Sequence, residues 1–191
     1  VLKKGTRIGA AEVDALRREG VSSIVIARLD SDDIGEDKAA ARIAHALKGS
    51  NVRVEDPFTG RANLFAEKAG VLVLDRARID AANAVAESIP FATLPAFAPV
   101  KTGEMIGTVK IIPFAVSQSV LDGTLAVLGE PVIRVAPFQP LRVAAISTIL
   151  PGLKYSAIAS TLQLLRDRLA PAGARGLRDD CWPPPADAPP A

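Results

Sequence analysis

Short helical and strand-like segments alternate along the first 90 residues of this 191-residue chain, and this alternation constrains the fold most strongly. Apolar β-branched runs are typical of strands, whereas apolar residues three or four positions apart are typical of helices. On this basis the sequence predicts helices over 10–19, 36–47, 61–68 and 79–87, and strands over 22–29, 52–55 and 71–74. Helices and strands at such short spacing favour stacked layers of both over a helical bundle.

Prolines divide the predicted elements more often after residue 90. We expect a strand over 105–113, a helix over 117–128, a strand over 131–135, a buried strand over 142–150 and an amphipathic helix over 155–169. The sequence therefore predicts a mixed α/β fold. Its expected parts are an N-terminal α+β domain over 1–137, the incomplete start of a three-layer α/β domain over 138–170, and a disordered proline-rich tail over 171–191.

Composition excludes several classes of function. Lys and Arg total 23 against 21 for Asp and Glu, and this net charge of +2 gives no reason to expect a nucleic-acid partner. One cysteine, Cys181, and one histidine, His45, exclude a disulfide framework and a cysteine- or histidine-rich metal site. No apolar run approaches the roughly 20 residues that span a bilayer, and no signal peptide is visible. We therefore expect a cytoplasmic protein without a membrane partner.

The segment 57–64, Pro-Phe-Thr-Gly-Arg-Ala-Asn-Leu, has the pattern most typical of a binding site. If a helix begins here, Thr59 and Gly60 expose unpaired backbone N–H groups that can bind an anion. Arg61 would add a planar fork for phosphate or carboxylate, and Asn63 could read a carbonyl or amide edge. The competing interpretation is that Thr59 only caps the helix and that Arg61 is solvated.

Lys110 lies within a predicted strand, where alternation places it on the same face as Thr108 and Ile112. A lysine between β-branched neighbours can be partly buried, and its charge can then serve a ligand. The alternative is a lysine on an edge strand, which protects the sheet from aggregation.

A second candidate site lies at the turn that follows the predicted 142–150 strand. Thr148 and the amides around Gly152 could meet a phosphate or a pterin, with Lys154 as the counter-charge. An ordinary strand-to-helix turn explains the same residues. The sequence contains no nucleophile motif and no acid–base constellation, so it predicts neither a catalytic residue nor a metal ligand.

Several motifs in a fixed order suggest a family. Residues 2–8 read Leu-Lys-Lys-Gly-Thr-Arg-Ile and precede Val13, Leu16 and the segment 19–24, Glu-Gly-Val-Ser-Ser-Ile. This arrangement resembles a segment of molybdenum-cofactor biosynthesis proteins. The segments 57–64 and 109–116, together with Asn83, resemble the N-terminal region of bacterial molybdopterin-binding proteins that often carry a fused nucleotidyltransferase. Residues 146–154 resemble the opening of the domain shared with molybdopterin molybdenumtransferases.

The resemblance implies an accessory protein that holds molybdopterin or its precursor as ligand or substrate, and any catalysis would be a transferase step of that biosynthesis. It implies pterin or anion binding by Thr59, Gly60, Arg61, Asn63, Lys110, Thr148, Gly152 and Lys154. A homo-oligomer or a nucleotidyltransferase partner is also implied. After Ala174 the sequence departs from the family, and it lacks an initiator Met, so we expect part of a longer protein.

The alternative to a binding protein is a non-catalytic structural or oligomerisation module. The helix over 155–169 carries Ile158, Leu162, Leu165 and Leu169 on one face. In this interpretation that apolar face packs on a partner subunit.

Overall fold

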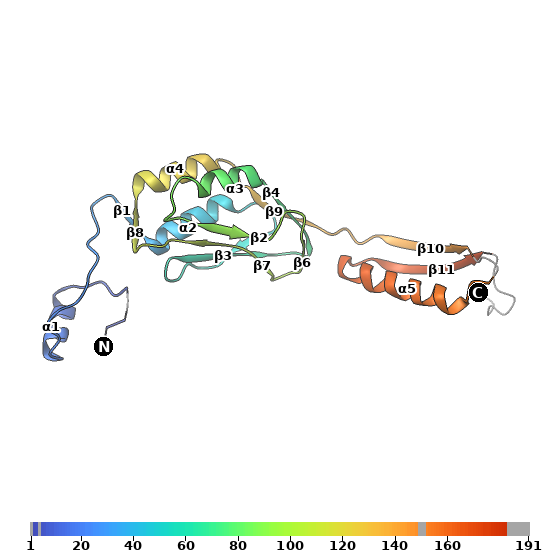
Figure 1. Cartoon of the computed structure of the whole chain (residues 1–191), viewed down its shortest axis with the longest axis horizontal. Coiled ribbons are helices and arrows are strands. Elements are labelled where there is room, and N and C mark those ends of the chain that lie inside the picture. Colours follow the sequence, from blue (N-terminus) through green and yellow to red (C-terminus); the bar gives the residue numbers. More distant parts are fainter. Residues whose placement is uncertain (1, 4, 149–151, 183–191) are drawn as a thin grey trace.

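The computed structural model describes residues 2–3, 5–148 and 152–182, and of 175–182 it describes the backbone. Helix α1 (Ala10–Arg18) lies at one end of an elongated molecule, and a unit formed by β10 (Arg142–Thr148), α5 (Tyr155–Leu169) and β11 (Arg175–Trp182) lies at the other end (Figure 1). The chain between them forms a central body of helices and antiparallel sheets, so the mixed α/β fold is confirmed. Among the described residues, no helix is both long and apolar enough to cross a membrane.

A four-stranded antiparallel sheet forms the floor of the central body. Its strands, in order across the sheet, are β2 (Val52–Val54), β3 (Arg61–Ala66), β7 (Met105–Lys110) and β5 (Phe91–Thr93). Along β3, Ala62, Leu64 and Ala66 are buried, whereas Arg61 is exposed and Asn63 is partly exposed. This alternation is typical of a sheet with one face in the core and the other in water.

Two smaller sheets complete the body. The first is antiparallel, in the order β6 (Pro99–Val100), β4 (Gly70–Leu74) and β9 (Ile133–Pro137). The second pairs β1 (Asp33–Gly35) with β8 (Ala115–Ser117). Because β1 precedes helix α2 and β8 precedes helix α4, this short pairing places the two helix starts side by side.

Helix α2 (Glu36–Leu47) contacts the buried face of the four-stranded sheet. Its buried stripe is made of alanines and two larger side chains, all with 0–1% exposure: Ala39, Ala40, Ile43, Ala44 and Leu47. Helix α4 (Gln118–Leu128) contacts α2 and also α3 (Arg76–Asn83), so that the three helices cover one side of the sheet (Figure 1).

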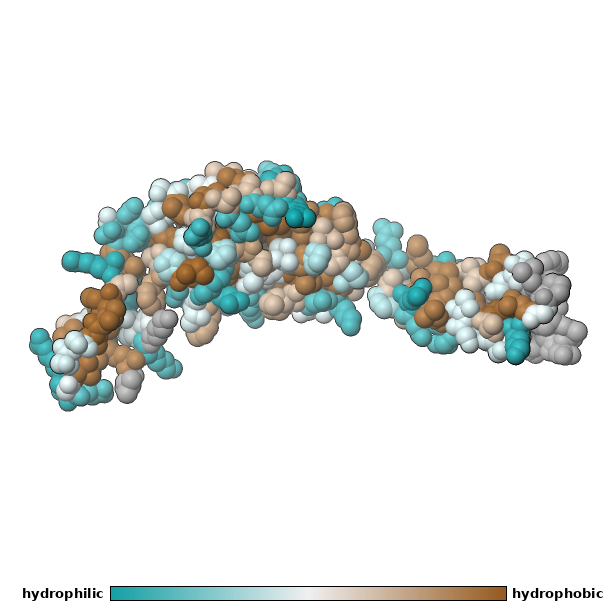
Figure 2. Space-filling model, in the orientation of Figure 1, coloured by the Kyte–Doolittle hydropathy of each residue, from teal (hydrophilic) through white to brown (hydrophobic). Residues whose placement is uncertain are grey.

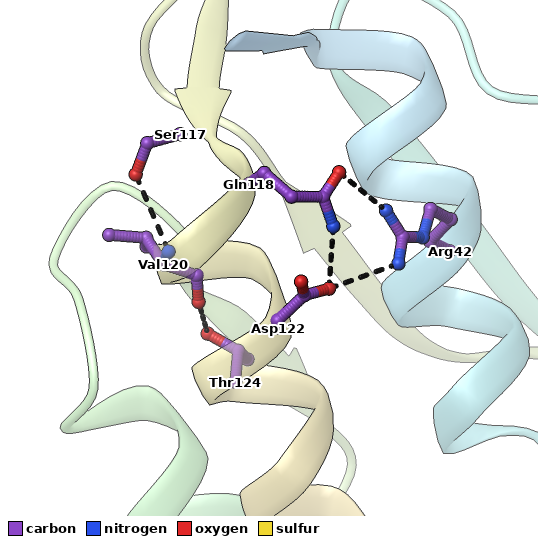
Figure 3. A network of polar contacts seen from close by, with 6 residues as sticks. All are labelled: Arg42, Ser117, Gln118, Val120, Asp122 and Thr124. Atoms are coloured by element: carbon purple, nitrogen blue, oxygen red, sulfur yellow. Dashed lines mark hydrogen bonds and ion pairs between the residues drawn. The ribbon is translucent and has the colours of Figure 1, made fainter. Parts of the chain in front are cut away.

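A polar network joins helices α2 and α4 (Figure 3). The Arg42 guanidinium donates to Gln118 Oε1 at 3.4 Å and to Asp122 Oδ1 at 3.2 Å, and Gln118 Nε2 donates to the same Asp122 oxygen at 2.6 Å. Within α4, the buried Thr124 hydroxyl donates to the Val120 carbonyl at 2.9 Å. Arg42 and Asp122 are both more than a third exposed, so their ion pair orients the helices more than it stabilises them.

A β-α-β unit follows the central body. Strand β10 (Arg142–Thr148) pairs in parallel with β11 (Arg175–Trp182), and α5 (Tyr155–Leu169) with a 3₁₀ turn (Ala170–Ala172) connects them. Parallel neighbouring strands need a crossover connection of this kind, because the end of the first strand and the start of the second lie at opposite edges of the sheet. Ile158 and Leu162 are buried in this unit.

Three of the sequence-based expectations are wrong. Residues 61–66 form strand β3 instead of a helix, because pairing with β2 and β7 selects the alternating burial of 62, 64 and 66. Residues 22–29 form no strand, and Val25 among them is fully exposed. The strand over 142–148 is not buried, since Ile146 is 78% exposed.

The segment 171–191, expected to be disordered, is partly structured. It includes most of the 3₁₀ turn and the whole of strand β11, which pairs along β10 from Arg142 to Thr148. Residues 183–191, like 149–150 of the expected strand, lie outside the described residues. By contrast, the helices expected over 36–47 and 155–169 occur with those bounds.

Two glycine substitutions are expected to change stability in opposite directions. A Cβ on Gly70 would overlap the carbonyl oxygen of Ala136 on the neighbouring strand and lie 2.8 Å from Pro137 Cα. Gly70→Ala should therefore lower the free energy of unfolding by about 2–3 kcal/mol. A Cβ on Gly123, within α4, would make an ordinary 3.7 Å contact with Val85. Since alanine favours a helix more than glycine does, Gly123→Ala should raise the free energy of unfolding by about 0.5–1 kcal/mol. Urea unfolding of both variants measures the two values, and equal effects would contradict this description of β4 and β9.

Candidate functional site

The expected site at Thr59 and Gly60 is a hairpin turn that opens strand β3. Phe58 and Arg61 exchange backbone hydrogen bonds of 2.9 and 3.1 Å across it. Thr59 and Gly60 have φ angles of 50° and 70°, the left-handed pair that a tight two-residue hairpin requires. The structure therefore corrects the prediction that a helix begins at this turn.

The Gly60 amide already has an anionic partner from within the chain. It donates to Asp37 Oδ1 at 2.7 Å, and Asp37 lies in the first turn of α2. The Glu36 carboxylate is also close, since a Cβ on Gly60 would lie 2.5 Å from its Oε2 and 2.9 Å from the Ile111 carbonyl oxygen. The prediction of an unpaired amide at Gly60 is therefore wrong, because α2 supplies the acceptor.

Arg61 and Lys110 are direct cross-strand partners on the open face of the sheet. Strand β7 lies between β3 and β5, so the alternative that placed Lys110 on an edge strand is wrong. The predicted alternation is confirmed, because Val109 and Ile111 are fully buried while Thr108 and Lys110 are half-buried. The Lys110 ammonium donates to the Thr59 carbonyl oxygen, and this bond ties the lysine to the hairpin turn.

The charges of Arg61 and Lys110 are not neutralised within the described part of the chain. Neither side chain forms an ion pair with a carboxylate there. Like charges directly opposite each other on a sheet destabilise the pairing. An anion that bridges the two cations would offset this repulsion, so we take the pair as the centre of the candidate site.

Next to this pair, a row of hydrogen-bonded polar side chains joins β7, β3 and the residue that follows β2. Asn63 Oδ1 accepts from the Thr108 hydroxyl at 2.9 Å, and Asn63 Nδ2 donates to Glu55 Oε2 at 3.3 Å. Sequence reasoning identified Asn63 but missed Glu55 and any role for Thr108. The alternation around Lys110 placed Thr108 on the correct face, whereas only the β2–β3 pairing brings Glu55 to Asn63.

An aromatic and cationic pair borders this row on the far side from Arg61. The Arg53 guanidinium carbon lies 4.7 Å from the centre of the Phe65 ring, and the two residues face each other across β2 and β3. Stacking of this kind is a cation–π contact that holds the arginine over the ring. Phe58, in the hairpin, is 77% exposed.

The second predicted group does not join the first. Thr148 is exposed at the end of β10, Gly152 has a φ of 86°, and Lys154 is the exposed residue that precedes α5. Residues 149–151 between them lie outside the described part of the chain. Figure 1 shows β10 and α5 well apart from β3 and β7, so the two groups are separate surfaces.

Comparison of the chain with protein-family models, with curated proteins and with solved structures finds no match in any of the three. Within the described residues, no three His, Cys, Asp or Glu side chains gather as a metal site would require. Fold and geometry therefore define a mixed α/β protein with a cationic, polar open sheet face.

The bond from Gly60 to Asp37 is expected to hold the hairpin turn against helix α2. Asp37→Ala removes the acceptor of a 2.7 Å bond and should lower the free energy of unfolding by about 1 kcal/mol. Asp37→Asn is the matched control, because it loses the same charge but keeps an oxygen that can accept. Thermal unfolding of both variants measures the difference, and an identical loss in the two would show that charge alone matters.

Proposed function

We propose that this chain binds an anionic pterin, molybdopterin or its precursor, as an accessory protein of molybdenum cofactor biosynthesis. The observation that carries the proposal is the Arg61–Lys110 pair on the open face of the four-stranded sheet. The motifs at 57–64 and 109–116, which suggest this family, contribute one member each to the pair. The proposal therefore rests on two segments that are distant in sequence and adjacent in the sheet.

The two cations suit a phosphate in complementary ways. A guanidinium binds phosphate through a planar fork, whereas an ammonium acts as a compact point charge. The bond from Lys110 to the Thr59 carbonyl uses one of its three N–H donors and leaves two for a ligand. Asn63, two positions along β3 from Arg61, presents an amide beside the same place.

This mode of binding differs from a backbone cradle. Since the Gly60 amide is bound by Asp37, the ligand anion would be held by side chains, and Thr59 and Gly60 would contribute by shaping the turn. At an open surface, salt screens the attraction between these cations and an anion over a Debye length of about 8 Å at physiological ionic strength.

Thr148, Gly152 and Lys154 form a second group, separate from the first, that we propose can also contact an anion.

The proposal predicts that molybdopterin binding depends on Arg61. Titration calorimetry should show an affinity at least about tenfold weaker for Arg61→Ala than for the unchanged chain, because a charge-assisted hydrogen bond is lost. Arg134→Ala is the matched control, since it removes an exposed strand arginine from the other sheet. Molybdopterin that fails to bind the unchanged chain, or that binds all three proteins equally, would overturn the proposal.

A second candidate function, an oligomerisation module, is favoured by the β-α-β unit. Its sheet has two strands and one covering helix, a size that is marginal by itself. Apolar side chains are exposed on it, namely Leu141, Ile146, Leu153, Tyr155 and Leu164, and Figure 2 shows apolar groups on its surface. The predicted contact face is corrected, because Ile158 and Leu162 are buried within the unit and Leu165 and Leu169 are half-buried.

This second candidate predicts self-association through the outer face of β10. Light scattering should then give a mass above that of one chain, and Ile146→Lys should return it to a monomer, because a charge would be buried in the contact. Val127→Lys changes a partly exposed residue on α4 and serves as the control. A monodisperse monomer at all concentrations would count against an oligomerisation module.

A further inference from the structure

We infer that Glu55, Asn63 and Thr108 form a recognition row for a 2-amino-4-oxo-pyrimidine edge, and that Arg61 and Lys110 hold a phosphate of the same ligand. The inference rests on the proposed function and deepens it, because it names the chemical feature that the site reads. A pterin and a guanine share this edge, so the ligand class is a phosphorylated heterocycle of that kind.

The row is organised by hydrogen bonds within the chain. Glu55 Oε2 accepts from Asn63 Nδ2 at 3.3 Å, and Asn63 Oδ1 accepts from the Thr108 hydroxyl at 2.9 Å. The Glu55 and Asn63 backbones are also bonded, through the Glu55 N–H and the Asn63 carbonyl at 2.9 Å. These bonds fix the direction of the amide, with its nitrogen toward the carboxylate, so the row has a defined order of donors and acceptors.

Capacity for further bonds remains in the row. Glu55 Oε1 has no partner among the described residues, and Asn63 Nδ2 carries a second hydrogen. A 2-amino-4-oxo-pyrimidine presents an amino group, a ring N–H and a carbonyl oxygen, in that order. A carboxylate accepts from the first two, and a neighbouring amide N–H donates to the third, so Glu55 and Asn63 match this edge in order.

The spacing of the row and the cations suits one ligand. Arg61 and Lys110 lie two residues along β3 and β7 from Asn63 and Thr108, which corresponds to roughly 7 Å along a strand. A phosphate carried on a short substituent of the ring can reach that distance. On the other side, the Arg53–Phe65 pair closes the row with a flat, partly apolar border.

The nucleotide experiment compares guanosine 5′-monophosphate with adenosine 5′-monophosphate, which carries the same phosphate but lacks the 2-amino-4-oxo edge. Calorimetry should show that the unchanged chain binds the guanine nucleotide about tenfold more tightly than the adenine nucleotide. The reason is that only guanine can donate from both a ring N–H and a 2-amino group to the Glu55 carboxylate. Glu55→Gln should reduce this preference to nearly onefold. Asp56→Asn, which removes an equal charge from the adjacent exposed carboxylate, should keep it.

The pteridine experiment separates the ring from the phosphate. Unphosphorylated pterin should bind more tightly than lumazine, which has an oxygen in place of the 2-amino group, and Glu55→Gln should abolish the difference. A pterin monophosphate compared with the guanine nucleotide identifies the source of the edge. Guanine binding without pterin binding would keep the row and remove the pterin from the proposed function.

Two outcomes would overturn the inference. Guanine and adenine nucleotides that bind equally, and that both depend on Arg61, would leave the anion site intact and show that the row reads no edge. A guanine preference that survives Glu55→Gln would place the recognition on other residues. Failure of every phosphorylated probe to bind the unchanged chain would instead overturn the proposed function itself.

Discussion

The close approach of helix α2 to the four-stranded sheet is the contact on which the central body depends. Ala39, Ala40 and Ala44 are fully buried, and such small side chains let the helix lie near the strands. The start of the helix is fixed by the β1–β8 pairing, and the Glu36 amide donates to the Phe114 carbonyl at 2.9 Å. Because this end is fixed, Asp37 meets the Gly60 amide, and the hairpin turn is held at the edge of the helix. The Ile111 amide donates to the Gly60 carbonyl of that turn at 2.7 Å, next to the Arg61–Lys110 pair of the β3–β7 register.

Because the Asp37 carboxylate accepts the hydrogen bond of the Gly60 amide, this amide is not available to bind a ligand anion. A backbone anion site would have placed the ligand at the turn, beside Asp37 and Glu36. With the amide occupied, the positive charge that faces solvent comes from side chains on the adjacent strands. In the proposed binding mode, affinity for a phosphate and recognition of a ring would depend on different residues of one sheet face, so substitutions would separate the two.

Local patterns predicted the helices better than the strands. The helix over 36–47 was predictable because its apolar stripe and its acidic first turn are both encoded within its own residues. The segment 61–66 was misassigned because Thr59-Gly60 followed by Arg-Ala-Asn-Leu suits a helix cap as well as a hairpin, and the strands that decide between them are distant in sequence. Residues 24–26, within the expected 22–29 strand, are β-branched, yet a strand also needs a partner, which none of the described residues provides. The site was predictable only in part for the same reason. Lys110 and Arg61 could each be identified from local sequence, whereas Glu55 joins the site only through the β2–β3 pairing.

The small net charge of the chain could not predict this candidate site either, because it does not depend on where the charges lie. A value of +2 averages over 44 charged residues and carries no information on how they are placed. Folding aligns Arg53, Arg61 and Lys110 on one open sheet face, while Asp37 lies at the hairpin and Asp122 pairs with Arg42. The face therefore carries three cationic side chains together with the Glu55 carboxylate, which accepts a hydrogen bond from Asn63. In the proposed binding mode, Glu55 would accept from N–H donors of the ligand while Arg61 and Lys110 would bind its anionic group, and a phosphorylated pterin or guanine presents both.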